Sequence, residues 1–172
     1  SIGAHPGFRC PIEPHETFED YYLLFEQDSY QVTQLNNGLR TTNKEALNLT
    51  AKKLKLSAEL FAKDALVFED AQINTITLAS SKSNRRITMR AKDWPYFGIW
   101  TKPGQKEFLC LEPWYGIADN ESHNGQLEAK EGFNSSAITP RLKNRNNPNI
   151  RVLKCAFILS SFPLKNNDKF VR

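Results

Sequence analysis

Short runs of alternating apolar and polar residues fill most of this chain, and turn-forming residues separate them. Phe18 to Glu26 is rich in Phe, Tyr and Leu, and Ser29 to Leu35 follows after a short break. Further on, Ile73 to Ala79 alternates apolar residues with threonines, and Arg86 to Arg90 follows after the polar turn Ser80 to Asn84. Such runs, spaced by roughly 8 to 12 residues, are typical of all-β proteins. The pattern predicts an all-β fold that contains hairpins.

Two turns strengthen this prediction. Lys102-Pro103-Gly104-Gln105 separates Tyr96 to Thr101 from Glu107 to Leu111. Its Pro presets φ and its Gly permits the left-handed position that a type II turn needs, so this is the strongest hairpin pattern in the chain. Asn36-Asn37-Gly38 supplies residues that tolerate positive φ. We expect a strand on each side of both turns.

One segment breaks the alternation. Residues 51 to 63 have apolar side chains at Leu54, Leu56, Leu60 and Phe61. This spacing predicts one short helix before Asp64.

Composition sets the broad class. The chain has 172 residues, of which 40% are hydrophobic and 24% charged, as in a single globular domain with a sizeable core. It contains no stretch of ~20 apolar residues, the length that spans a membrane. Its first residues lack the basic and apolar regions of a secretory signal. We therefore expect a cytoplasmic protein that has no membrane partner.

The charge is unevenly distributed. Eight of the 23 basic residues, but only one of the 19 acidic residues, follow Phe133. This leaves 15 basic and 18 acidic residues before that point, a formal charge of −3. An acidic body provides no footprint for a phosphate backbone, so no nucleic-acid partner is expected.

The cysteines indicate no cross-link. Cys10, Cys110 and Cys155 form an odd and widely spaced set, which suits neither a disulfide framework nor a zinc site with paired cysteines. They are interpreted as buried free thiols. The histidines show no metal-ligand spacing either, so no metal is expected.

Three residues are candidates for chemistry. His5 lies in the turn-forming sequence His5-Pro6-Gly7-Phe8, where partial burial against Phe8 tunes an imidazole pKa; the alternative is a structural or exposed histidine. Glu112 has apolar neighbours and precedes Pro113, which is expected to end the strand. The alternative for Glu112 is a buried ion pair with an arginine. Asp64 precedes an apolar run and faces either the same cavity or a turn.

The aromatic residues beside Glu112 indicate a ligand class. Trp114 and Tyr115 follow the carboxylate closely. Flat rings that stack on the apolar face of a pyranose, next to groups that bind its hydroxyls, are typical of sugar sites.

Longer motifs then point to one family. SIGAHPGF at the start of the chain, FEDYYLLF from Phe18, KDALVF from Lys63 and YFGIWTKPGQKEFLCLEPWYGIAD from Tyr96 occur in that order. They resemble the LacX-like branch of the aldose 1-epimerase, or galactose mutarotase-like, family. The resemblance covers residues 1 to about 133, and its last motif is the most specific.

The resemblance implies an all-β galactose mutarotase-like β-sandwich (supersandwich) with a sugar-binding cleft. It implies that His5 is the general acid and Glu112 the general base in the interconversion of α and β anomers of a free aldohexose, glucose or galactose. Asp64 would bind sugar hydroxyls, with Trp114 and Phe8 as further substrate-binding residues. No cofactor is required.

The chain also departs from that family. Relatives carry a long N-terminal half before the HPGF motif, so residues 1–133 are interpreted as the C-terminal part of an incomplete sandwich. Residues 134–172 form a basic, Asn-rich tail that does not resemble the family, and either a changed reading frame or a genuine extension explains it. Activity would then require a complementary N-terminal polypeptide. The alternative function is a non-catalytic carbohydrate-binding remnant of that family.

Overall fold

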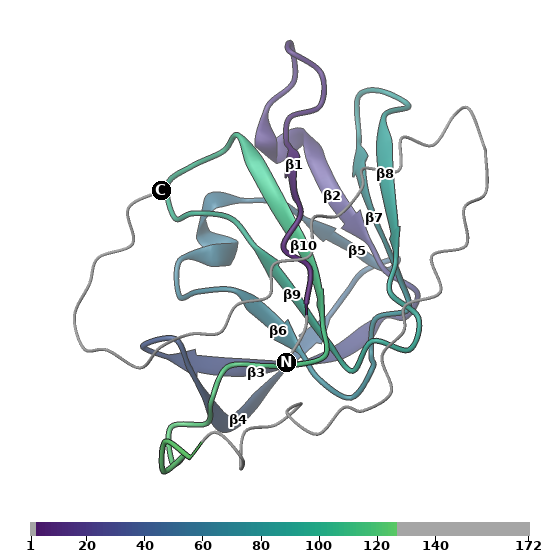
Figure 1. Ribbon diagram of the computed structural model, residues 1–172. Helices are drawn as coiled ribbons and strands as arrows, with labels where there is room; N and C mark the ends of the chain where they lie inside the picture. Colours follow the sequence, from purple (N-terminus) through teal and green to yellow (C-terminus); the bar gives the residue numbers. More distant parts are fainter. Residues whose placement is uncertain (1–2, 127–172) are drawn as a thin grey trace.

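The computed structural model describes residues 3–126, in which ten strands and two short 3-10 helices alternate with turns (Figure 1). The helices are η1 (Phe18–Asp20) and η2 (Ala58–Phe61). The strands are β1 (Gly7–Arg9), β2 (Tyr21–Leu24), β3 (Ser29–Asn36), β4 (Leu39–Asn48), β5 (Lys53–Lys55), β6 (Leu66–Phe68), β7 (Thr75–Ser80), β8 (Arg86–Arg90), β9 (Tyr96–Trp100) and β10 (Phe108–Trp114). The all-β prediction is confirmed.

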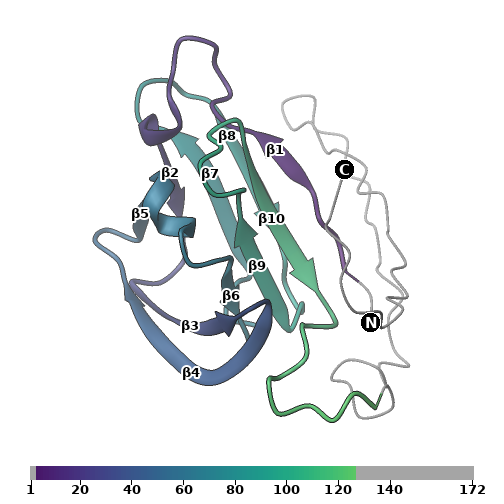
Figure 2. The same cartoon turned by 90° about the vertical axis from the view of Figure 1, so that its left-hand side faces the viewer.

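The strands form two antiparallel sheets. The larger has six strands in the order β1-β10-β9-β6-β3-β4, and the smaller has four in the order β5-β2-β7-β8. In the larger sheet β10 lies between β1 and β9, so residues from the beginning and the end of the described chain become neighbours (Figures 1 and 2).

A single hydrophobic core lies between the sheets. From the smaller sheet, Tyr21, Leu23 and Leu78 are fully buried. From the larger sheet, Ile99 and Leu111 are fully buried in the same cluster. Strand residues alternate between two faces, so every second residue of β9 and β10 is available for the outer face of the larger sheet.

The predicted hairpins are confirmed. β7 pairs with β8, and β9 pairs with β10 so that Trp100 lies opposite Cys110. The β9–β10 connection uses Gly104 at a φ of +79°, and Gln105 donates its N–H to the carbonyl of Lys102. The pattern of turn residues therefore locates these hairpins correctly.

The short helix predicted between residues 51 and 63 is confirmed only for the last part of that segment. The segment contains β5 and η2. β5 pairs with β2, and the N–H of Leu56 continues this contact by donating to the carbonyl of Tyr21. Helix propensity is a weak preference, and pairing with a buried strand overrides it here.

The expectation that Pro113 ends its strand is wrong, because β10 continues to Trp114. A proline at this position costs one ladder bond, because it has no N–H to return to its partner. Pro113 accepts a hydrogen bond from Ala4, in a segment that precedes β1 and is itself irregular. The missing N–H of Pro113 therefore leaves one ladder bond unmade beside Glu112.

The proposed boundary at residue 133 and the basic tail of residues 134–172 lie outside the described residues. Within residues 3–126, no helix is long and apolar enough to cross a membrane.

Candidate active site

The alternation of β10 separates core residues from site residues. Leu109 and Leu111 are fully buried in the core between the sheets. Cys110, Glu112 and Trp114 are the alternate residues, so they share the opposite face of the larger sheet. This face holds the candidate site.

His5 lies directly opposite Glu112. β1 pairs with β10 so that Gly7 faces Cys110, and an isolated bridge continues the same register to Gly3 and Trp114. Halfway between these two pairs, the register places His5 opposite Glu112. Paired residues of an antiparallel ladder project to the same face, so the register brings imidazole and carboxylate together.

Two prolines lie in the backbone pairs on either side of His5 and Glu112. Ala4 donates its N–H to the carbonyl of Pro113, and Leu111 donates its N–H to the carbonyl of Pro6. Neither proline can return the bond, because proline has no N–H. Because hydrogen-bonded and non-hydrogen-bonded pairs alternate along an antiparallel ladder, His5 and Glu112, which lie between these two half-bonded pairs, form a non-hydrogen-bonded pair. In non-hydrogen-bonded pairs the side chains come closest.

The side chains meet at hydrogen-bond distance. His5 Nε2 lies 3.2 Å from Glu112 Oε1, and the two side chains are 54% and 3% exposed, respectively. His5 also meets Trp100 edge to face, with ring centroids 6.2 Å apart. The imidazole therefore reaches solvent while the carboxylate lies beneath it.

Burial raises the pKa of Glu112 to about 8, against the opposing effect of hydrogen bonds with Trp114 and Cys110. A carboxyl group in an apolar site resists ionisation because its charged form loses hydration. Once ionised, Glu112 is a stronger base than an exposed glutamate and is matched to work near neutral pH.

Trp114 is held beside the carboxylate by two glycines. A Cβ atom at Gly98 would lie 2.3 Å from the Trp114 ring, and one at Gly3 would lie 2.7 Å from it. Both distances are far below a van der Waals contact, so the indole occupies space that a side chain at either position would fill. The ring is thereby fixed on the site face of β9 and β10.

These residues line a cleft of about 300 Å³. His5, Glu112 and Trp114 contribute to its wall, together with Trp100 and Asp64. This volume is at the lower end of the range of small-molecule pockets, as suits a compact ligand. The cleft combines aromatic surfaces with two carboxyl groups and an imidazole.

Asp64 reaches the cleft from the turn before β6. Its φ of 143° is unusual for a residue with a side chain, and its Oδ1 atom accepts a hydrogen bond from the Ala65 N–H at 2.7 Å. Strained backbone of this kind costs on the order of 1–3 kcal/mol and is concentrated at functional sites. The turn holds the carboxylate at the edge of the cleft.

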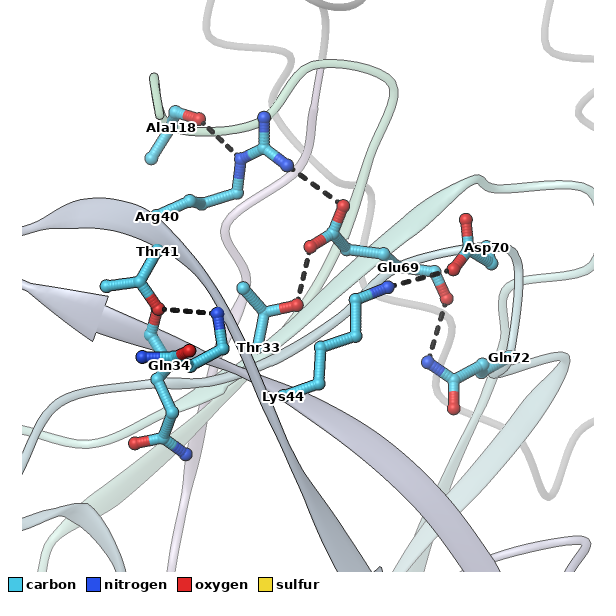
Figure 3. A network of polar contacts seen from close by, with 10 residues as sticks. Thr33, Gln34, Arg40, Thr41, Lys44, Glu69, Asp70, Gln72 and Ala118 are labelled. Carbon is cyan, nitrogen blue, oxygen red and sulfur yellow. Dashed lines mark hydrogen bonds and ion pairs between the residues drawn. The ribbon is translucent and has the colours of Figure 1, made fainter. Parts of the chain in front are cut away.

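Arg40 was not among the predicted site residues, although it lines the cleft. Figure 3 shows its guanidinium between two anchors: it donates to Glu69 at 2.9 Å and to the carbonyl of Ala118 at 2.8 Å. Thr33 donates its hydroxyl to the same carboxylate. This buried network joins β3 and β4 to the segment after β10, which places Ile117 and Ala118 in the cleft wall.

No local sequence pattern identifies Arg40, because its partners are distant in the sequence. Trp100 is different, because alternation along Tyr96 to Trp100 puts it on the same face as Gly98. Its role as an aromatic wall could have been inferred from that strand alone.

Two aromatic residues of the sequence motifs, Phe8 and Tyr115, lie outside the cleft. Phe8 pairs with Leu109 and packs in the core at 8% exposure, so the structure does not bring it to the cleft. Trp100 provides the aromatic wall beside His5 that was expected from Phe8. Tyr115 packs on Trp94 and donates its hydroxyl to the carbonyl of Asp93.

The described cysteines are free and buried, as expected for Cys10 and Cys110. Cys155 lies outside the described residues. Cys110 faces the site, and burial together with the adjacent Glu112 raises the pKa of its thiol to about 12. Its Sγ atom, the imidazole of His5 and the carboxylate of Glu112 lie within 4.8 Å of one another.

The fold is the galactose mutarotase-like β-sandwich, as solved structures show. The chain superimposes on a galactose mutarotase related enzyme from Lactobacillus acidophilus with a TM-score of 0.68 and 32% identity, covering 76% of this chain and 44% of the other. A galactose mutarotase-like protein from Lactobacillus casei shares the fold at a TM-score of 0.61 and 24% identity, over 76% of this chain and 46% of the other.

The curated relatives that match this chain are LacX proteins. The plasmid and chromosomal LacX proteins of Lactococcus lactis subsp. lactis are each 32% identical to this chain over 133 residues, which cover 75% of this chain and 44% of each LacX protein. No protein-family model matches the chain. The relatives and solved structures support a mutarotase-like family. The chain spans less than half the length of the LacX proteins that it matches.

Proposed function

We propose that this chain carries the acid–base pair of an aldose 1-epimerase, which interconverts the α and β anomers of a free aldohexose such as glucose or galactose. The observation that carries the proposal is the contact between His5 and Glu112 in a small cleft with aromatic walls. The likeness to galactose mutarotase related proteins supports a sugar as the substrate.

The reaction needs two groups close together because both proton transfers occur at oxygens bonded to the same carbon. Glu112, as the carboxylate, removes the proton from the C1 hydroxyl. His5, as the imidazolium, donates a proton to the ring oxygen, and the bond between C1 and that oxygen breaks. The product is the open aldehyde, with Glu112 protonated and His5 neutral.

Rotation about the C1–C2 bond then presents the other face of the aldehyde. The ring hydroxyl attacks C1 and gives its proton to His5, while Glu112 returns its proton to the carbonyl oxygen. The opposite anomer forms and both side chains regain their starting states. A positioned acid or base contributes ~10²- to 10⁴-fold, and no cofactor enters the cycle.

Before the sugar binds, His5 and Glu112 contact each other, so a ring must enter between them. The exposure of His5 permits its side chain to swing aside, whereas Glu112 is fixed by burial. Trp114, Trp100 and Asp64 line the cleft. In the proposed complex a pyranose stacks on the indole rings, and its hydroxyl groups donate hydrogen bonds to Asp64.

A polarimetric assay with freshly dissolved α-D-glucose and α-D-galactose tests the proposal. Anomerisation faster than the buffer blank supports it, and the absence of acceleration by folded protein contradicts it for this chain alone. Because the chain spans 44% of the LacX proteins, the assay is repeated with the remaining part of a LacX protein added. Activity only in the mixture would support a complementary polypeptide.

The second candidate function is sugar binding without turnover. The limited coverage of the relatives favours it, because this chain matches only 44% of each LacX protein. Titration with galactose, followed by tryptophan fluorescence, separates the two functions. Saturable binding without anomerisation supports the binding module.

A further inference from the structure

Three different metal-binding donors meet beside the cleft. Glu112 and Cys110 project from the same face of β10, and His5 lies opposite Glu112 in the adjoining segment. The imidazole, thiol and carboxylate donor atoms all lie within 4.8 Å of one another. Among residues 3–126, no other set of three such side chains comes this close.

The separations suit a single small cation. In tetrahedral zinc sites with bonds of about 2.0 to 2.3 Å, ligand atoms lie about 3.3 to 3.8 Å apart. His5 Nε2 and Glu112 Oε1 already lie 3.2 Å apart. The exposed imidazole can rotate to close the remaining distance, whereas Glu112 and Cys110 are held by the strand.

The donor types select the cation. A thiolate with an imidazole favours Zn²⁺ over Mg²⁺ or Ca²⁺, which prefer oxygen ligands. Three protein ligands leave a fourth tetrahedral position for water. The exposed His5 marks the side from which the ion and its water enter.

We propose that His5, Cys110 and Glu112 form a Zn²⁺ site and that occupation of this site blocks the cleft. The ion displaces the proton of Cys110, which leaves to solvent, and binds the neutral imidazole and the carboxylate. The imidazole nitrogen that binds the ion has no proton to donate to the ring oxygen, the bound carboxylate of Glu112 is a weaker base, and the ion with its water occupies the space between the two side chains that the sugar needs. The inhibition rests on the proposed epimerase function, whereas metal binding does not.

Metal binding is tested first on the full chain after treatment with a chelator. Co²⁺ replaces Zn²⁺ as a spectroscopic probe, because thiolate coordination gives a charge-transfer band. We expect one equivalent of Co²⁺ to saturate that band and Zn²⁺ to abolish it. Cys110→Ser should remove the band, and His5→Asn should weaken binding of Zn²⁺, measured by calorimetry, ~10-fold or more.

Cys155→Ser is the matched control and should leave the band unchanged. His5→Asn alters an exposed side chain and therefore keeps the test valid if Cys110→Ser fails to fold. No thiolate band in the wild type, or a band of equal strength in folded Cys110→Ser, would overturn the zinc site.

Inhibition is tested by adding Zn²⁺ to the polarimetric assay. Loss of turnover that follows the Zn²⁺ binding curve supports the proposal, and full turnover at saturating Zn²⁺ overturns the inhibitory part. Metal binding by a chain without any epimerase activity would contradict the proposed function and the inhibition while leaving the zinc site established.

Discussion

His5 and Glu112 form a non-hydrogen-bonded cross-strand pair. In each of the two neighbouring pairs, a proline removes one ladder bond. Pro6 lies beside His5 and Pro113 beside Glu112, so each catalytic candidate has a proline as its chain neighbour. The pairing of the two backbone segments thus keeps His5 Nε2 and Glu112 Oε1 3.2 Å apart.

Removing either member of the pair should nearly abolish anomerisation. Glu112→Gln retains the size of the side chain but cannot accept a proton, and His5→Asn cannot donate one as an acid. Each change is expected to lower turnover at least ~100-fold, measured by polarimetry with the buffer rate subtracted. A folded variant with near-normal turnover would exclude that residue from its role.

Turnover should pass through a maximum as pH rises, because the reaction needs Glu112 ionised and His5 protonated. Burial raises the pKa of Glu112 to about 8, and only the ionised carboxylate accepts the proton from C1. The fraction of ionised Glu112 decreases as pH falls below about 8, and the fraction of protonated His5 decreases as pH rises. The measurement is a pH–rate profile of the metal-free protein with a chelator present, and a profile that falls at neither the acid nor the alkaline end would contradict the paired roles of Glu112 and His5.

The same carboxyl group should make stability depend on pH. Its folded pKa of about 8 lies above the ordinary unfolded value of about 4.3. Between these values the folded state binds more protons than the unfolded state, so the free energy of unfolding should fall as pH rises.

Urea unfolding at a series of pH values, compared between the wild type and Glu112→Gln, isolates this contribution. We expect the wild type to lose stability relative to the variant from about pH 4.3 to about pH 8. Parallel curves would show that Glu112 ionises normally. This comparison does not depend on catalytic activity.

Adding a methyl group at Gly98 should displace Trp114. The new Cβ atom would lie 2.3 Å from the indole, so Gly98→Ala is expected to lower the free energy of unfolding by ~1–3 kcal/mol and to weaken galactose binding. Chemical unfolding and a tryptophan fluorescence titration measure the two effects.

Gly7→Ala is the control on the same sheet face. Its Cβ atom would meet Cys110 at 3.6 Å, an ordinary van der Waals contact. If Gly98→Ala and Gly7→Ala change the free energy of unfolding and galactose binding equally, the position of Trp114 does not depend on the space above Gly98.

Breaking the Arg40 network should cost far more than breaking an exposed ion pair. Arg40→Met leaves the Glu69 carboxylate buried without its cation, which typically costs ~3–5 kcal/mol. It also removes the bond to Ala118 that holds the cleft wall. Urea unfolding should show the loss, and sugar affinity should fall with it.

Lys44→Met provides the comparison, because Lys44 and Asp70 form an exposed pair 3.2 Å apart in the same view (Figure 3). Exposed ion pairs contribute ~0–1 kcal/mol. Equal losses of unfolding free energy in Arg40→Met and Lys44→Met would mean that Arg40 contributes no more than an exposed surface charge.

Local patterns in the sequence correctly predicted the fold class and several of its elements. Alternation from Tyr96 onwards and the turn at Lys102-Pro103-Gly104-Gln105 indicated a hairpin that the structure contains. These features are local, because side-chain alternation and turn geometry depend on residues close in the chain. Residue chemistry also indicated His5, Glu112, Asp64 and Trp114, which the structure gathers around one cleft.

Which residues meet depends on strand pairing between distant parts of the chain. β1 and β10 come from opposite ends of the described chain, and their register places His5 opposite Glu112 while Phe8 turns into the core. Pairing with β2 made a strand of residues 53–55, in the first part of the segment where a helix was expected. A shift of one residue in register reverses the face of every side chain, so long-range pairing, which no local pattern encodes, determined the composition of the cleft.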